Sequence, residues 1–470
     1  MVKIKGVIAI KTYQDLIAVG ENERDRIDFV LSVISDHQGS RLCRTAQTAE
    51  TYYGGENATI MNYCKLIRDA YGKAVPDIWS PNHKIACRYY GYLVNQLALF
   101  LLGNGVSFGK PETKERLGSG FDKAALDVLI FALNGSVGYG FVNNGKVTPF
   151  SVQEFAALQD EETSAIRAGV RYWQIDADRP LRATLYEEDG YTEYIRRKGE
   201  DMVVLNEKRP YILIVQSSEA TGDEIVDGRN YQAFPIVPLY NYGKRSELEG
   251  NREAHDAVDL MLSGLVNNVD AGEIVYWLVK NSSGMDQPSM NQLLQTLKAA
   301  HIAQIDTDDD IQAHSTQVQF AASKEALDQP RRQVFDNHMG LDVRNIASGA
   351  ATATQIRAAY EPLNTKADLL EYCVTEFILG VLKVMGIDDV PTYTRSYIVN
   401  QQESIGSIIA AGENLPQSYK TKKILEILGD IDKVPEVLEE MDAVESDRFA
   451  PDNEDKDEEP EGAESEGAGE

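Results

Sequence analysis

Cysteine is scarce in this chain, with four residues among 470, namely Cys43, Cys64, Cys87 and Cys373. No two of them lie within four positions of one another, so the paired spacing of a zinc knuckle is missing. The sequence therefore predicts no metal site, and no motif calls for a cofactor. Cys87 and Cys373 fall in apolar helical patterns, where we expect buried free thiols. Free thiols fit a reducing cytoplasm.

Long apolar runs are also missing. No stretch of about 18 apolar residues occurs, so no membrane-spanning helix is expected. The opening run MVKIKGVI is too short and too interrupted by lysine to be a secretory signal. The sequence thus predicts a protein without a membrane partner.

Basic residues are outnumbered, with 46 Lys and Arg against 74 Asp and Glu and a net charge of −28. A protein that grips phosphates over its whole surface has the opposite balance, so tight non-specific DNA binding is disfavoured. Residues 447–470 hold eleven acidic and two basic residues, a net −9, which leaves −19 on the other 446. Because that segment has almost no apolar side chains, we expect it to be a disordered acidic tail.

The N-terminal part reads as helices. Apolar residues recur near a period of 3.6 in two helices over about 23–53, and Gly54-Gly55 ends the second. A further helix over about 88–102 is predicted to bury one broad face, made of Tyr92, Leu93, Gln96, Leu99 and Phe100. Gly103 ends it.

Between about 135 and 238 the period changes to two, which indicates a β-rich module. Asn144-Gly145 is a strong hairpin turn because both residues tolerate positive φ, and Asp189-Gly190 predicts a second one. Strands are expected at 182–187, 191–197 and 211–216. The run 234–238 should be extended because its two prolines disfavour helix.

From about 247 the helical period returns, with a stripe formed by Ala254, Val258, Met261, Leu265 and Val269. A mixed segment follows, with a strand at 274–279, a polar loop at 281–288, a helix at 293–300 and a strand at 301–305. Helix resumes near 323 and is expected to bend or restart at Pro330.

A long helix over 362–385 is predicted to bury Leu363, Ala367, Leu370, Val374, Phe377, Val381 and Met385. The segment 345–360 is rich in small residues and reads as a mobile loop or weak helix. Short helices are expected at 403–411, 419–428 and 435–444. In total, the pattern predicts a multidomain α+β protein.

One motif raises the alternative of a nucleotide-binding enzyme. Gly140 to Lys146 fits the G-x-x-x-x-G-K of a phosphate loop, but Val147 stands where Ser or Thr would bind Mg²⁺, although Thr148 follows. The context also favours two strands joined by a turn instead of a strand joined to a helix. We therefore expect a β-hairpin there and no catalytic residue.

Four acidic residues, Asp306, Asp308, Asp309 and Asp310, could suggest a calcium loop. Counting from Asp306, the glycine and glutamate that an EF-hand needs are replaced by Ile311 and Gln317. A solvated acidic loop is the favoured interpretation, and an ad hoc divalent ion in an assembly is left open.

Histidines and tyrosines offer two weaker signals. The six histidines form no H-E-x-x-H motif and are expected to be scattered core or surface residues. Tyr89, Tyr90 and Tyr92 beside Arg88 could stack on nucleic-acid bases. Their helical spacing favours packing in a core or subunit interface instead.

Several short motifs, in their collinear order, resemble tailed-phage portal proteins of the Gp6-like (SPP1-type) family over about 42–442. The motifs are YYGGEN (52–57), NHKI (82–85), LLG (101–103), VGYG (137–140), FPIVPLYN (234–241), LEG (248–250), Ser348-Gly349 and the stretch 412–432. The chain departs from the family pattern at Gly103-Asn104-Gly105 and in the polar character of 351–359.

The resemblance implies a structural protein that forms a ring of twelve subunits at a virion vertex, assembled in the host cytoplasm. It implies a wing (1–245), two stem helices (246–270 and 323–342) and a clip (271–322). It also implies a tunnel loop with a long wing helix (343–390), and a crown (391–446). Implied partners are double-stranded DNA, the terminase large subunit, a head-completion or adaptor protein, and the major capsid and scaffolding proteins.

Within this frame, the residues expected to touch DNA in the channel are Arg344, Asn345, Gln355, Arg357 and Tyr360, with inter-subunit salt bridges as the equal alternative for the two arginines. The acidic residues at 306 and 308–310 would face partners of the clip. Because like charges repel, low salt should favour smaller species. Besides a portal protein and a nucleotide-binding enzyme, the third alternative is a head or scaffold protein without a channel.

Overall fold

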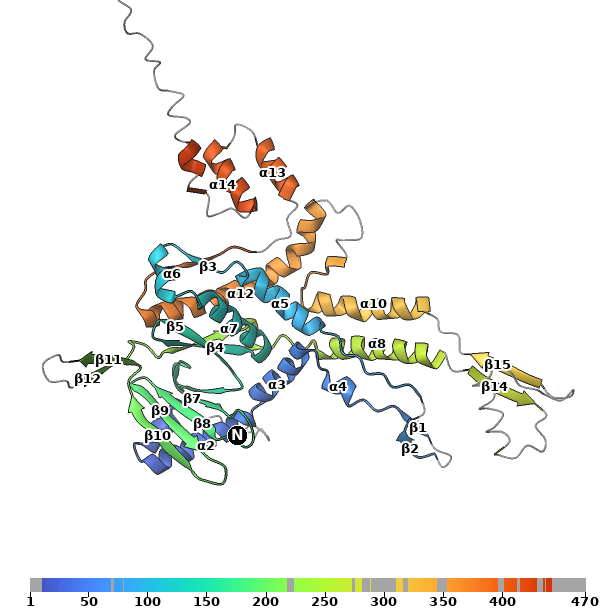
Figure 1. The fold of residues 1–470 in the computed structure, drawn as a ribbon, viewed down its shortest axis with the longest axis horizontal. Helices are drawn as coiled ribbons and strands as arrows, with labels where there is room; N and C mark the ends of the chain where they lie inside the picture. The colour runs from blue at the N-terminus through green and yellow to red at the C-terminus, as the bar shows by residue number, and fades with distance from the viewer. Residues whose placement is uncertain are drawn as a thin grey trace, which may run out of the picture. The chain divides into compact units, whose positions relative to one another are not determined.

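The structure, a computed structural model, describes residues 11–68, 72–78, 80–217, 224–272, 275–280, 288, 310–315, 320–344, 353–395, 401–411, 415–428, 434–435 and 437–441. They form two compact units. The large unit holds the described residues up to 344 together with 356–395, and the small unit holds 353–355 and the described residues from 401 onward. Helices and strands are both abundant (Figure 1), so the predicted α+β class is confirmed.

Most helices belong to the large unit. They are α1 (Tyr13–Val19), α2 (Glu23–Gln38), α3 (Arg41–Gly54), α4 (Ala58–Met61), α5 (Tyr89–Leu102), α6 (Pro111–Leu117), α7 (Phe121–Gly135), η1 (Tyr242–Lys244), α8 (Arg252–Gly272), α10 (Phe320–Asn337) and α12 (Ala353–Met385). The small unit contains α13 (Gln401–Ala410) and α14 (Gln417–Leu428), which pack against each other and confirm two of the predicted short helices. Residues 437–441, inside the third, are also helical.

Antiparallel pairing organises all the described strands. A five-stranded meander has the order β10 (Met202–Arg209), β9 (Gly190–Arg196), β8 (Leu181–Glu187), β7 (Ile166–Trp173), β6 (Phe155–Gln159). A three-stranded sheet has the order β13 (Ile236–Tyr240), β4 (Val137–Asn143), β5 (Lys146–Ser151). Two-stranded ribbons pair β1 (Leu66–Arg68) with β2 (Ala74–Pro76), β11 (Ile212–Ser217) with β12 (Glu224–Arg229), β14 (Val275–Lys280) with β15 (Asp310–Ser315), and β16 (Pro391–Tyr393) with β3 (Val106–Phe108).

The predicted β-rich module and its strands are therefore confirmed, with one shift at a turn. Glu187 pairs with Gly190, so the loop residues are Glu188 and Asp189, one position before the predicted turn. The extended run at 234–238 is also confirmed. Pro238 is tolerated because β13 is an edge strand, where a missing N–H removes no ladder bond.

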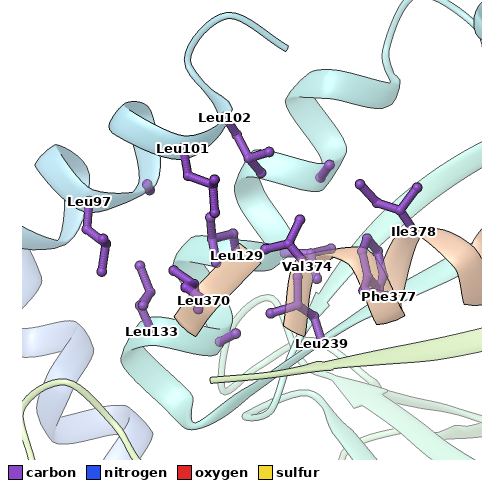
Figure 2. Packing of buried hydrophobic residues seen from close by; sticks show 14 of the residues in the cluster. Leu97, Leu101, Leu102, Leu129, Leu133, Leu239, Leu370, Val374, Phe377 and Ile378 are labelled. Carbon is purple, nitrogen blue, oxygen red and sulfur yellow. The ribbon is translucent and has the colours of Figure 1, made fainter. Parts of the chain in front are cut away.

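The main core lies where α5, α7 and α12 meet the three-stranded sheet. Figure 2 shows packed side chains from α5 (Leu97, Leu101, Leu102), α7 (Leu129, Leu133) and α12 (Leu370, Val374, Phe377, Ile378) together with Leu239 of β13. The stripe predicted on the long helix is buried from Leu363 to Val381, and only Met385 at its end is half-buried.

Two helices continue through a proline at which the sequence predicted a start, a restart or a bend. The long helix begins at Ala353 and passes through Pro362, because Tyr360 and Leu363 on either side of it are buried in the core. Helix α10 begins at Phe320 and runs through Pro330 without a restart. In α12, tertiary packing outweighs the local effect of a missing N–H donor.

The buried face of α5 was predicted wrongly in part. Leu93 and Phe100 are buried as expected, but Tyr92 and Leu99 are 46% and 48% exposed. The helix is apolar almost all round, so periodicity alone does not select the face. The elements that pack on α5 are distant in sequence and make that choice, with Tyr90 against His255 and His338 and Phe100 against Tyr360.

Several predictions lie outside the described residues. They are the loop at 281–288 apart from residue 288, the helix at 293–300, the strand at 301–305, the loop residues 345–352 and the tail at 447–470. The strand predicted at 274–279 is confirmed as β14. Its partner β15 was not predicted, because its sequence DIQAHS carries little apolar alternation.

Candidate functional site

Helices α8 and α10 lie side by side (Figure 1) and run antiparallel. His255 near the start of α8 meets His338 just beyond the end of α10, with 3.0 Å between their Nε2 atoms. Val334 and Phe335 of α10 join Val258 of α8 in a small apolar cluster. Because this cluster is far smaller than the main core, polar contacts must contribute much of what holds α8 in place.

An extended segment, residues 83–87, runs along α8, and we call it the strap. The backbone N–H groups of Cys87, Ile85 and His83 donate to Asp259 Oδ1 at 2.8 Å, Ser263 Oγ at 3.0 Å and Asn267 Oδ1 at 2.6 Å. Two extended residues advance about 6.6 Å and four helical residues about 6 Å, so alternate strap residues meet successive turns of the helix. The NHKI motif therefore lies against one face of α8.

Asn57, in the YYGGEN motif, links the N-terminal helices to the same face. Its Nδ2 donates to Asp256 Oδ1 at 2.9 Å and to Asp259 Oδ2 at 2.8 Å, and its Oδ1 accepts from the N–H of Ile60 at 3.2 Å. The hydroxyl of Tyr52 donates to Asp256 at 2.5 Å. Burial raises the pKa of Asp259, whereas the bonds from Asn57 and Cys87 lower it. We call this group the Asn57 hub.

A second polar group, separate from the hub, surrounds the two histidines. Burial lowers the pKa of His255 to about 3 and also lowers that of His338, so both rings are neutral at pH 7 and one donates to the other. Burial alone would raise the pKa of Glu247, but His338 and Lys366 lower it to about 2. Lys366 Nζ lies 2.5 Å from Glu247 Oε2 and donates to the carbonyl of His338 at 2.9 Å.

The residues predicted to contact DNA are only partly brought together. Arg344 is exposed, and its Nη2 donates to the hydroxyl of Tyr89 at 3.3 Å. Gln355 and Arg357 are exposed near the start of α12, and Asn345 lies outside the described residues. Tyr360 is buried, with its ring stacked on Phe100 at a centroid distance of 5.9 Å. That burial removes Tyr360 from the candidate channel surface, a correction to its predicted role.

Of the neighbouring tyrosines of α5, Tyr90 packs in the core as favoured from the sequence, whereas Tyr89 is half-buried and Tyr92 is 46% exposed. Tyr90 is buried edge-on against His255 and His338, at centroid distances of 5.7 and 5.9 Å. Tyr89 and Tyr92 lie beside Phe335 of α10 at 5.8 and 6.3 Å. All three rings therefore contact residues of the α8–α10 helix pair or its ends.

The acidic run is described only at its end. Asp306, Asp308 and Asp309 lie outside the described residues, and Asp310 opens β15 opposite Lys280. Asp310 thus belongs to a strand and not to the predicted loop. In the described part of the chain, no three His, Cys, Asp or Glu residues cluster as metal ligands. No helix there is long and apolar enough to cross a membrane.

The phosphate-loop alternative is not met by the geometry. Residues 140–146 form the end of β4, a turn and the start of β5, with Asn143 paired to Lys146. Asn144 and Gly145 have φ of 48° and 71°, as in the predicted hairpin turn. Gly140 serves packing, because a Cβ there would lie 2.8 Å from the ring of Phe377. No helix N-terminus follows to hold a phosphate.

Sequence reasoning missed the strap contacts, the hub and the histidine pair. His255 and His338 are 83 positions apart, and Asn57 and Asp259 are 202 apart, so no local pattern joins them. One signal was present. His255, Asp259 and Ser263 recur at every fourth position beside the apolar stripe of α8, and all three are buried. The expected burial of Cys87 and Cys373 is only partial, since both are half-buried.

Known proteins match this chain at the level of family. The family described as phage portal protein, SPP1 Gp6-like, matches residues 33–448. A portal protein of Clostridium phage phiCD119 is 24% identical over 198 residues, which cover 38% of this chain and 43% of that protein. The match thus spans less than half the length of that relative.

Solved structures give weaker similarity. A chain from the virion of a native gene transfer agent particle has a TM-score of 0.43 at 12% identity, covering 72% of this chain and 88% of that one. A chain from the neck of the native particle, computed with C12 symmetry, has a TM-score of 0.40 at 12% identity, covering 71% and 87%.

Proposed function

The chain belongs to the phage portal proteins of the SPP1 Gp6-like family, and we propose that its copies form a ring through which double-stranded DNA enters and leaves a viral head. The family match over residues 33–448 is the observation that carries this proposal. That family is one of structural proteins. The proposed ring of twelve copies stands at the capsid vertex of the virion and is assembled in the host cytoplasm.

We assign the proposed layers to the elements of the fold. The helix pair α8 and α10 would form the stem, with helices at 252–272 and 320–337 in place of the ranges first expected. The ribbon β14–β15 and the chain between its strands would form the clip. The N-terminal helices, the sheets and α12 would form the wing, and α13 with α14 the crown.

In the channel, the duplex must slide without being trapped. Basic side chains along a narrow passage would bind phosphates and create deep energy wells, which an acidic chain avoids. A few isolated cations can centre the duplex, and we propose Arg344 and Arg357 for this role, with Asn345 and Gln355 beside them. Tyr360 would instead anchor α12 to the body through its contact with Phe100.

At the clip, we propose that Asp306, Asp308, Asp309 and Asp310 face the proteins that dock there. These are the terminase large subunit during packaging and a head-completion or adaptor protein afterwards. The major capsid and scaffolding proteins would contact the wing. Acidic side chains at this layer would select partners with basic docking surfaces.

Native mass spectrometry of the purified chain tests the proposal. A ring predicts one dominant species of many copies at moderate salt. A shift toward smaller species is expected at low ionic strength, because repulsion between acidic subunits is then least screened. A chain that stays monomeric at every salt concentration would contradict the proposal. Substituting Lys146→Ala should change neither the number of subunits in the ring nor nucleotide hydrolysis.

A further inference from the structure

Before the strap, the chain forms a hairpin with uncovered apolar side chains. We call residues 61–68 and 72–78 the arm. Its strands β1 and β2 have three residues each, and Figure 1 shows them as a ribbon apart from the sheets of the body. Four large side chains of the arm are 45%, 48%, 60% and 79% exposed, respectively Met61, Tyr63, Leu66 and Ile78. An isolated two-stranded ribbon is marginal in water, and several large exposed apolar side chains within one short segment favour a contact surface there.

The base of the arm is tied to the body on both sides. Before the arm, the N–H of Ile60 donates to Asn57 of the hub at 3.2 Å. After it, Lys84 in the strap donates to the carbonyl of Met61 at 2.5 Å. The strap itself is bonded to α8 at every second residue. The arm is therefore presented from a fixed base, which reduces the conformational entropy lost on binding a partner.

The charge of this region differs from that of the rest of the chain. Residues 61–88 hold five Lys or Arg and two Asp, a net +3 in a chain of −28. Lys65 pairs with Asp77 at 3.7 Å. Arg68 is exposed and donates to the carbonyl of Gly72 at 3.3 Å. The partner that fits such a surface is acidic and also offers apolar area.

We propose that the arm binds an adjacent copy of this same chain and so forms part of the subunit contact. This inference rests on the proposed ring. A second copy supplies both requirements, because its net charge is −28 and its described residues expose further large apolar side chains such as Tyr372 and Val390. The phosphates of DNA would pair with Lys65 and Arg68. They would leave Leu66 and Ile78 without an apolar contact. An arm from one copy on a different surface of the next is a head-to-tail contact, the type that closes rings.

Charge substitution at the two most exposed apolar positions tests the arm. The double variant Leu66→Asp with Ile78→Asp should reduce the ring fraction at least tenfold at fixed protein concentration and salt, measured by native mass spectrometry. The matched control is Ile175→Asp between β7 and β8, because that isoleucine is 86% exposed and lies outside the arm. The control should keep the wild-type ring fraction. Circular dichroism should be the same for all three chains, since none of these side chains is buried.

Cys64 gives a second measurement without substitution. Its thiol is exposed in the arm, and reaction with N-ethylmaleimide can be followed on the Cys64 peptide. The reaction should be at least tenfold slower in the ring than in the chain dissociated by low salt. Equal rates would overturn the proposal.

The outcomes separate the two levels of inference. A wild-type chain that forms no ring overturns the proposed function and the arm contact together. A wild-type ring that the double variant forms equally well overturns the arm contact alone. A double variant that keeps its ring but binds a duplex oligonucleotide at least tenfold more weakly assigns the arm to DNA and also overturns the proposal.

Discussion

The main core holds its helices by apolar packing, whereas α8 is held largely by polar contacts. We call those polar contacts of α8 with the strap, the Asn57 hub and His338 the polar seat. Around α12, the buried side chains are apolar and numerous (Figure 2), so each contributes by removing surface from water. On α8, the buried face carries His255, Asp259 and Ser263, each with a named hydrogen-bond partner. Apolar packing tolerates small slides, whereas hydrogen bonds at fixed spacing do not. We infer that the core supplies stability and the polar seat fixes the register of the helix pair.

The largest effect is expected in the core. Phe377→Ala removes a fully buried ring beside Gly140 and should destabilise the chain by about 3–5 kcal/mol through lost burial and a cavity. Tyr372→Ala, on the same helix but 75% exposed, should change stability by less than about 0.5 kcal/mol. Chemical denaturation at matched oligomeric state measures both. Similar losses for the two variants would contradict the stabilising role of the buried core.

The Asn57 hub should give the next effect. Asn57→Ala leaves the carboxylates of Asp256 and Asp259 without their shared donor, at an expected loss of about 2–3 kcal/mol. The matched control is Asn82→Ala, since that residue is exposed and lies outside the arm and the strap. Hydrogen exchange should also speed up in α8 and the strap more than in α12. Uniform loosening of the whole chain would contradict a local role for the hub.

Acid should weaken the seat through its histidines. In the unfolded chain His255 takes up a proton near pH 6.5, whereas in the fold it does so only near pH 3, so the folded state is favoured above pH 7 and loses this advantage as pH falls. Between pH 7 and 4.5 the loss is about 2–3 kcal/mol for that one residue. Below pH 4.5, protonation of Glu247 in the unfolded chain acts in the same direction, since its folded pKa is about 2.

The variant His255→Gln measures this contribution. It should flatten the dependence of the denaturation midpoint on pH between 7 and 4.5, whatever it does to stability at pH 7. Glu247, Lys366 and Tyr90, which surround the pair, remain unchanged in this variant. An unaltered slope would show that the histidine pair is not what acid disrupts.

The smallest effect is expected at the exposed end of the strap. His83→Ala removes the contact between the ring and Asp270, at 2.8 Å and about half exposed on both sides. The backbone N–H of residue 83 keeps its bond to Asn267. Exposed pairs contribute little, so the expected loss is about 0.5 kcal/mol or less. A loss as large as that of Asn57→Ala would mean that side chains and not the backbone hold the strap.

The sequence predicted what depends on local pattern and missed what depends on contacts between distant residues. Hairpin chemistry at Asn144-Gly145 and the stripe on α12 are local, and both are confirmed. The exposed face of α5 is set by elements far along the chain, and periodicity misplaced Tyr92 and Leu99. The strap was present in the sequence as the NHKI motif, yet its role requires α8, about 180 positions later. The family followed from the order of such motifs, which is information beyond any single pattern.

A cryo-electron microscopy reconstruction of the purified chain tests the central claim most directly. We predict a closed ring of identical subunits with an open axial channel, in which each α8–α10 pair keeps the strap along α8 and the arm touches the next subunit. A solitary subunit, or a closed particle without an axial opening, would contradict it.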